Sequence, residues 1–253
     1  MSATTTARRM AAAAAVLAMI GAGCGSPEEQ GADTARNPAP TSATTSADAA
    51  PLAGFVEPVD GTEGTVTYQA ELPQLRGGDA EVRDRFNAAM RAALDDHLKP
   101  ADDDAPMTIA PGVLPEDERS AVSHIGTRAV AGVLVLNIYV DRAAHPFNTV
   151  STTVIDTATA APIMITDLFA DDAAGFSALV DGINAEIAED EKLAGQSAPA
   201  PVADQLAAWV PDDDGLVVYI SVAHVLGDYY PITVDWDVLD PVLAPGMREM
   251  LTA

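Results

Sequence analysis

Residues 133–140, with the sequence VLVLNIYV, are almost continuously apolar. A strand with one solvated face alternates apolar and polar residues, whereas a strand covered on both faces is apolar throughout. We therefore expect a strand at residues 132–141 that lies in the centre of its sheet. Another strand is expected at residues 119–127. Gly132 lies near the turn between the two, which predicts a hairpin.

The segments on either side supply further strands and two helices. Residues 63–72 alternate apolar and polar side chains, as a half-buried strand does. Apolar residues recur at helical spacing over 79–98 and 171–189, and Asp79 is the expected N-cap of the first helix. Further strands are expected at residues 147–155, 162–165, 216–223 and 232–236. Together these elements predict an α+β fold, in which two principal amphipathic helices pack on a mainly antiparallel sheet.

Composition narrows the classes of partner. The 253 residues contain 13 Lys and Arg against 38 Asp and Glu, which gives a formal charge of −25. Such an excess of carboxylates repels phosphate backbones, so we expect no nucleic-acid partner. With 48% hydrophobic residues the chain can form a sizeable core. Its single cysteine excludes an intramolecular disulfide and any site built from several cysteines.

The first 24 residues have the pattern of an export signal. Arg8 and Arg9 precede an apolar stretch, residues 10–20, which is shorter than the roughly 20 residues that span a bilayer. Small residues then lead to Cys24. This arrangement resembles the lipobox of bacterial lipoproteins, although Gly21 stands where that family usually has Leu. The resemblance implies cleavage before Cys24 and a lipid on that residue, which would hold the protein on the outer side of the cell membrane. The alternative is an ordinary signal peptide with a chance cysteine.

We accordingly divide the chain into three parts. Residues 1–23 are the expected signal peptide, and residues 24–54 are an expected disordered tether that is rich in small and polar residues and poor in large apolar ones. Residues 55–253 form the α+β domain. A proline-rich, acidic segment near residues 100–118 is a candidate internal boundary.

Three segments in this order resemble a known family. They are residues 142–156, with RAAHP followed by the strand TVSTTVID, residues 163–169, IMITDLF, and the pair 214–220 and 231–236. The order resembles the C-terminal extracellular domain of RsiV-type proteins, a domain of unknown function, and mycobacterial secreted immunogenic proteins are similar. The resemblance implies an actinobacterial or mycobacterial envelope protein that binds something outside the cell. RsiV itself is a transmembrane anti-sigma factor that binds lysozyme, but this sequence shows no membrane-spanning segment, so we do not expect that regulatory role.

The candidate ligand-binding residues precede the last strand. The family often has the sequence APYAAG there, whereas this chain has the stretch 224–230, which contains His224, Asp228, Tyr229 and Tyr230. Aromatic rings with polar tips suit contacts with sugars or proteins. His145, before a proline at a strand start, is the fifth candidate. The alternatives are that the His145 ring bonds backbone at a corner, and that one tyrosine fills the core while the other covers it.

Signals for catalysis are weak. Residues 175–179 come nearest to a G-x-S-x-G nucleophile motif, but they lack the second glycine, and Ser177 falls within a predicted helix. The histidines have no metal-ligand spacing, and the acidic runs at 102–104 and 212–214 lack the pattern of a calcium loop, so we interpret these runs as solvated turns. We expect no catalytic residue, cofactor or metal. The function that we predict is a lipid-anchored binding module for a cell-wall glycan or a secreted protein such as lysozyme, and the alternative is a secreted, cell-wall-associated esterase.

Overall fold

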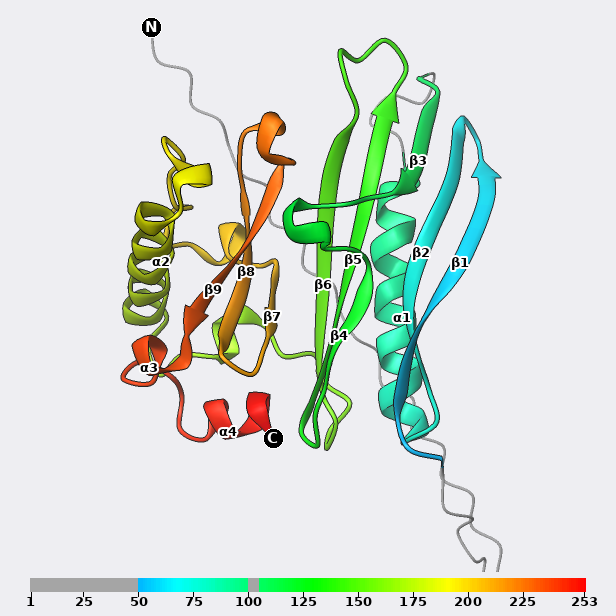
Figure 1. The fold of residues 1–253 in the computed structure, drawn as a ribbon. Helices are drawn as coiled ribbons and strands as arrows, with labels where there is room; N and C mark the ends of the chain where they lie inside the picture. The colour runs from blue at the N-terminus through cyan, green and yellow to red at the C-terminus, as the bar shows by residue number, and fades with distance from the viewer. Residues whose placement is uncertain (1–49, 100–104) are drawn as a thin grey trace, which may run out of the picture. The chain divides into compact units, whose positions relative to one another are not determined.

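The computed structural model describes residues 50–99 and 105–253 (Figure 1). The predicted signal peptide, Cys24 and residues 24–49 of the predicted tether lie outside the described residues. The first strand, β1, begins at Ala53, so the last two residues of the segment predicted as a tether belong to the fold. None of the helices within the described ranges is long and apolar enough to cross a membrane.

Six strands form the larger sheet. They are β1 (Ala53–Glu63), β2 (Val66–Arg76), β3 (Met107–Pro111), β4 (Ala121–Ile125), β5 (Ala129–Val140) and β6 (Phe147–Asp156). The order of hydrogen-bonded neighbours is β1-β2-β3-β5-β4. Strands β3 and β4 pair with different stretches of one edge of β5, and β6 pairs with the opposite edge. The pairing of β2 with β3 is parallel and the other pairings are antiparallel. Because β3 joins β2 to β5, the sheet continues through the segment that was a candidate internal boundary.

Three strands form a second, antiparallel sheet in the order β7-β8-β9. They are β7 (Trp209–Pro211), β8 (Gly215–Ser221) and β9 (Tyr229–Asp235). The helices are α1 (Ala80–His97), α2 (Asp172–Glu189), α3 (Trp236–Leu239) and α4 (Met247–Thr252). Short 3₁₀ turns are η1 (Pro115–Asp117), η2 (Ile165–Asp167), η3 (Glu191–Leu193), η4 (Ala203–Gln205) and η5 (His224–Leu226).

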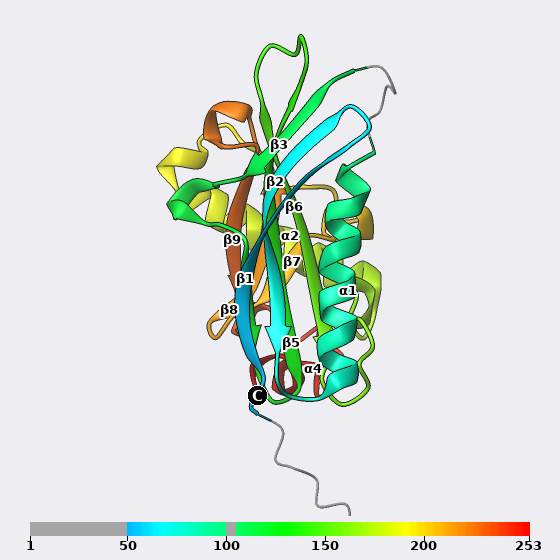
Figure 2. The same ribbon diagram turned by 90° about the vertical axis from the view of Figure 1, so that its right-hand side faces the viewer.

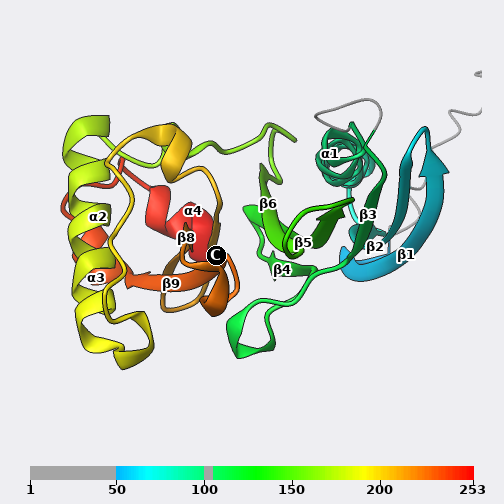
Figure 3. The same ribbon diagram turned by 90° about the horizontal axis from the view of Figure 1, so that it is seen from above.

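Each long helix covers its own sheet. Helix α1 packs against β2, β5 and β6 (Figure 2), and α2 packs against β9. Seen from above, α2, the second sheet, strands β4–β6 and α1 follow one another in space (Figure 3). The α+β class with mostly antiparallel strands and two main helices is confirmed. The sequence did not reveal that the strands divide into two sheets.

The apolar run at 133–140 lies where its pattern predicts. Even-numbered residues of β5, such as Leu134 and Leu136, belong to the core that α1 covers. Odd-numbered residues, such as Val133 and Val135, belong to the core shared with α2 and the second sheet. Strand β5 is therefore buried on both faces, and both faces must be apolar.

The ends of both long helices also agree with the sequence. The Asp79 carboxylate accepts hydrogen bonds from the backbone N–H groups of Glu81 and Val82, which caps α1. The Asp171 carboxylate accepts one from Ala174 N–H and caps α2 in the same way. These caps satisfy donors that the first turn of a helix leaves without partners.

Candidate functional site

The outer edge of β6 carries the backbone groups around which the candidate site is built. Val135 of β5 directs its N–H and C=O away from β6, to the Ser120 hydroxyl and the Gly112 N–H. Its partner in the register is Val150, so the two form a pair without mutual hydrogen bonds, and the backbone of Val150 points outward. Because the backbone groups of a strand point to alternate sides from one residue to the next, the N–H and C=O of Thr152 also point away from β5.

Both ends of this edge are occupied by the chain itself. At one end, the backbone N–H of Asn148 donates to Asp228 Oδ2 at 2.7 Å. At the other end, the carbonyl of Val154 accepts a hydrogen bond of 2.8 Å from the N–H of Ile163. Between these closures, the described residues supply no hydrogen-bond partner for the backbone groups of Val150 and Thr152. The open part of the edge is therefore short.

A groove of about 680 Å³ lies along this open edge. Its walls come from β6, from the segment 197–208, and from β8 and β9 of the second sheet. Uncharged polar groups dominate its lining, together with one carboxylate: Ser151, Thr152, Ser197, Gln205, Ser221, Tyr219, Tyr229 and Asp204. The groove thus presents hydroxyl and amide groups beside free backbone donors and acceptors.

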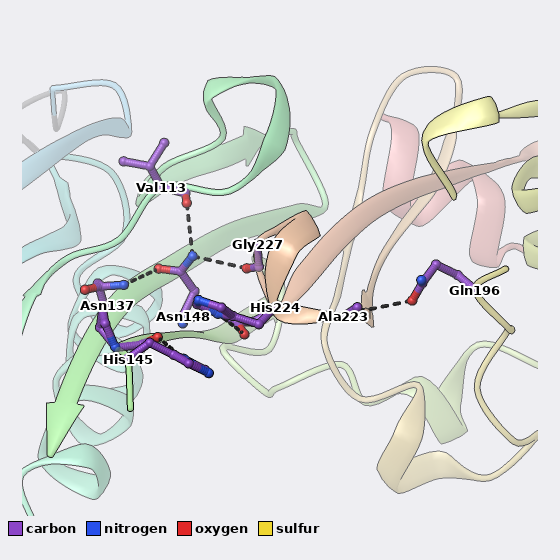
Figure 4. Close-up of polar contacts among 10 residues, drawn as sticks. Val113, Asn137, His145, Asn148, Gln196, Ala223, His224 and Gly227 are labelled. Carbon is purple, nitrogen blue, oxygen red and sulfur yellow. Dashed lines mark hydrogen bonds and ion pairs between the residues drawn. The ribbon is translucent and has the colours of Figure 1, made fainter. Parts of the chain in front are cut away.

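Hydrogen bonds hold the walls of the groove in place. The Thr152 hydroxyl accepts from Trp209 N–H at 3.1 Å, which fixes β6 against the start of β7. Gln205 Oε1 accepts from Ala200 N–H, and Gln196 Oε1 accepts from Ala223 N–H, the contact drawn at the right of Figure 4. The first of these two bonds ties the segment 197–208 to itself, and a backbone bond of 2.9 Å from Tyr219 N–H to the Ala208 carbonyl ties it to β8.

Three of the five predicted site residues meet at the end of the groove that Asp228 closes. The rings of His145 and His224 stack with centroids 3.8 Å apart and an interplanar angle of 14° (Figure 4). His224 Nδ1 lies 2.9 Å from Asp228 Oδ1, and His145 Nδ1 lies 2.9 Å from the Pro146 carbonyl. The latter is the backbone contact that the alternative interpretation of His145 predicts.

Asn148, which sequence reasoning missed, is the centre of this cluster. Its side-chain amide donates to the carbonyls of Val113 and Gly227, both at 3.1 Å, and accepts from Asn137 (Figure 4). These bonds join β6 and β5 to the loop before η1 and to the turn before β9. No sequence signal identifies such a residue, because its four partners come from distant parts of the chain.

The two tyrosines take opposite sides of β9. Tyr229 is half-buried and lines the groove. Tyr230 is buried, and its hydroxyl donates to Asp190 Oδ2 at 2.7 Å. Burial and this bond raise the pKa of Tyr230, and the same bond lowers the pKa of Asp190. Only Tyr229 is therefore placed to contact a ligand in the groove.

A serine and a histidine meet at the rim of the groove. His97 Nε2 at the end of α1 lies 3.4 Å from Ser151 Oγ, on the face of β6 that α1 covers. Burial lowers the pKa of His97, so its imidazole is neutral at pH 7 and can accept a proton. Within the described ranges no carboxylate bonds the other ring nitrogen. Ser177, the serine considered from the sequence, lies exposed on α2.

Metal binding finds no support in this part of the chain. Residues 50–99 and 105–253 contain no group of three or more His, Cys, Asp and Glu side chains that could hold a metal ion. The acidic run at 102–104 lies outside the described residues.

Comparisons with known proteins identify the fold. No family model and no curated protein matches the chain. A crystal structure of a DUF3298 family member from Bacteroides fragilis matches with a TM-score of 0.53 and 14% identity, and the match covers 80% of this chain and 98% of that one. The two proteins share a fold. A DUF3298 protein from Pseudomonas aeruginosa matches with a TM-score of 0.43 and 11% identity, over 78% of this chain and 95% of that one.

DUF3298 is related to the RsiV-type domains that the sequence resembles, so the resemblance is confirmed at the level of the fold. The actinobacterial origin and the lipid anchor stay predictions.

Proposed function

We propose that this protein is a binding module of the bacterial cell envelope that holds a cell-wall polymer in the groove along β6. In this proposal a lipid on Cys24 anchors the chain outside the cell, and the segment that follows it spaces the folded domain from the membrane. The fold shared with a DUF3298 protein is compatible with such a role but names no ligand.

The lining of the groove carries the proposal. A cell-wall polymer presents many hydroxyl and amide groups, and a site for it needs donors and acceptors at several positions together with an apolar surface. The groove offers hydroxyl groups on both walls, the amide of Gln205 and the ring of Tyr229. The bonds around Thr152 and Gln205 hold these groups in place before any ligand arrives, which reduces the entropy lost on binding.

The test is sedimentation of the detergent-solubilised full chain with purified, insoluble peptidoglycan. We expect Tyr229→Ala to weaken binding about tenfold, because it removes the ring from the groove. Tyr139→Ala is the matched control, since Tyr139 is exposed and does not line the groove. Equal binding by the two variants would show that the groove is not the site.

A secreted cationic protein is the competing ligand. The acidic chain attracts such a protein through its overall field, and attraction of that kind weakens as salt screens the charges. Binding to a lysozyme-type protein that survives moderate salt, without binding to peptidoglycan, would replace the wall polymer as the ligand. The anchor is tested separately: Cys24→Ala should release the protein from the membrane fraction, and sedimentation of this variant with membranes would show that no lipid is needed.

The contact between His97 and Ser151 supports a second candidate function, a serine esterase of the cell wall. A neutral imidazole near a hydroxyl is the minimal pair for activation of a nucleophile, although 3.4 Å is a long contact for that purpose. Turnover of a short-chain p-nitrophenyl ester by the full chain is the assay. Activity that disappears in Ser151→Ala and persists in Ser177→Ala would establish the esterase and overturn the binding module.

A further inference from the structure

We propose that the part of the wall polymer recognised at this site is its peptide, and that the peptide binds as a short extended strand along the open edge of β6. The inference rests on the proposed function and makes it more specific. Peptidoglycan consists of glycan strands that carry short peptides, so its two chemistries can be tested separately.

The first argument is the set of backbone groups on the edge. Val150 and Thr152 each direct an N–H and a C=O away from β5 into the groove. Within residues 50–99 and 105–253 nothing pairs with these four groups. Their spacing is the two-residue repeat with which one strand presents donors and acceptors to the next. A peptide segment of two or three extended residues can match this repeat, whereas a sugar ring does not.

The second argument is the length of the opening. The position beside the outer edge of β6, where a paired strand would lie, is occupied at Asn148 by Asp228 and at Val154 by Ile163. At about 3.3 Å per residue, the five residues between these two positions provide roughly 16 Å of free edge. A strand longer than about five residues would meet one of the closures, and so would the chain that continues on either side of a strand in a folded protein. A short peptide with free ends fits between them.

The third argument is charge. Asp204 is the one carboxylate among the groove-lining residues, and none of them is cationic. Free amino groups on the short wall peptides would therefore find a partner in Asp204 and no like charge on the lining. A peptide without an amine would lack this partner in Asp204.

The experiment compares three soluble probes with the detergent-solubilised full chain by isothermal titration calorimetry. The probes are muropeptides with sugar and peptide, the peptides that an amidase releases from purified peptidoglycan, and the glycan strands that remain. We expect the muropeptides and the free peptides to bind and the peptide-free glycan to bind at least tenfold more weakly. Hydrogen exchange should slow at the amides of Val150 and Thr152 when the free peptides bind.

Val150→Pro is the decisive variant. It removes an N–H that points out of the sheet, so the ladder between β5 and β6 keeps its hydrogen bonds. We expect binding of the free peptides to fall about tenfold, because one backbone hydrogen bond is lost and the proline ring occupies space that the paired peptide needs. Val150→Thr keeps the N–H and the shape of the side chain, and it should bind as the unchanged protein does. Asp204→Asn gives a second test that leaves the backbone intact. It should weaken binding of the peptides and leave binding of the glycan unchanged.

The outcomes separate this inference from the proposed function. If the peptide-free glycan binds as well as the muropeptides, or if Val150→Pro and Asp204→Asn both leave peptide binding unchanged, the inference is wrong and the binding module stands. If none of the three probes binds, the proposed function itself is wrong. Protection of the Val150 and Thr152 amides without an effect of Val150→Pro would also overturn pairing through that N–H.

Discussion

Substitution of Asp228 tests the junction that closes one end of the groove. This residue has a left-handed backbone, with φ of 69°, and its carboxylate bonds both Asn148 N–H and the His224 ring. A single position therefore combines an unfavourable backbone conformation with two hydrogen bonds to a charged group. Asparagine, glycine and alanine separate these contributions.

The expected loss of unfolding free energy depends on which hydrogen bonds each substituted residue retains and on how well it tolerates the left-handed backbone. Asparagine tolerates a left-handed backbone and still accepts a bond from Asn148, so Asp228→Asn should cost about 1 kcal/mol of unfolding free energy. Glycine adopts the backbone freely but loses both bonds, whose combined value at this partly exposed site is about 2–3 kcal/mol. Alanine loses the same bonds and adds about 1–2 kcal/mol of strain, so Asp228→Ala should be the least stable of the three.

Urea unfolding of each variant measures the order. The informative comparison is glycine against alanine, because alanine is normally the more stable of the two. Asp181 on α2 is the control: it is exposed in a helix, where alanine should be about 1 kcal/mol more stable than glycine. The same order at residues 228 and 181 would refute the strained backbone, and full stability of Asp228→Gly would refute the contribution of the two bonds.

Three further predictions concern the core and the titratable groups. A Cβ added to Gly132 would lie 2.6 Å from Phe86 Cζ, so Gly132→Ala should cost about 1–3 kcal/mol in urea unfolding, and Phe86→Leu should recover part of that loss in the double variant. Burial lowers the pKa of His124, so this residue takes up a proton at a higher pH in the unfolded chain than in the folded chain. The free energy of unfolding should therefore fall as the pH drops below about 6.5. His124→Leu should flatten this decline in thermal melts between pH 7 and 5, and an unchanged slope would contradict the assignment. The buried Tyr219 hydroxyl donates to Glu118 at 2.9 Å, so Tyr219→Phe should cost about 1 kcal/mol of unfolding free energy. Burial raises the pKa of Tyr219, so in a titration followed by tyrosinate absorbance this residue should ionise at a higher pH than the exposed Tyr139 does.

The central strand and both long helices could be predicted because their signals are local. The run at 133–140 reports two buried faces, and the caps Asp79 and Asp171 lie directly before the helices that they begin. Strand β1 was missed because it pairs only with β2 and most of its side chains are exposed, so no apolar alternation marks it. Strand β7 has three residues, which is too short for any periodic pattern.

The candidate site could be predicted only in part, for a different reason. Its groove is assembled from β6, the segment 197–208 and the second sheet, which no local pattern connects. Tyr229 was found because an aromatic residue in a loop is conspicuous. Ser151 and Thr152 were not, because hydroxyl residues on a strand are ordinary until the neighbouring segment is known. The closure of the groove by Asp228 and Asn148 depends on contacts across about 80 residues of sequence.

Strands β1 and β6 each pair with only one neighbour in the large sheet, and their free edges are protected in different ways, which bears on the ligand. Strand β1 carries Glu57, Pro58 and Asp60, and charged residues and proline are the usual means by which an edge avoids pairing with another chain. The open stretch of β6 has neither. Its residues, 149–153, are three threonines, one valine and one serine, and threonine and valine favour strands. Access is restricted by the wall at 197–208 and by the closures at either end. Edge protection alone would not require this arrangement, since a charge or a proline at residue 150 would suffice. An edge that pairs readily but admits only a short chain is the property that a binding site for a short extended ligand needs.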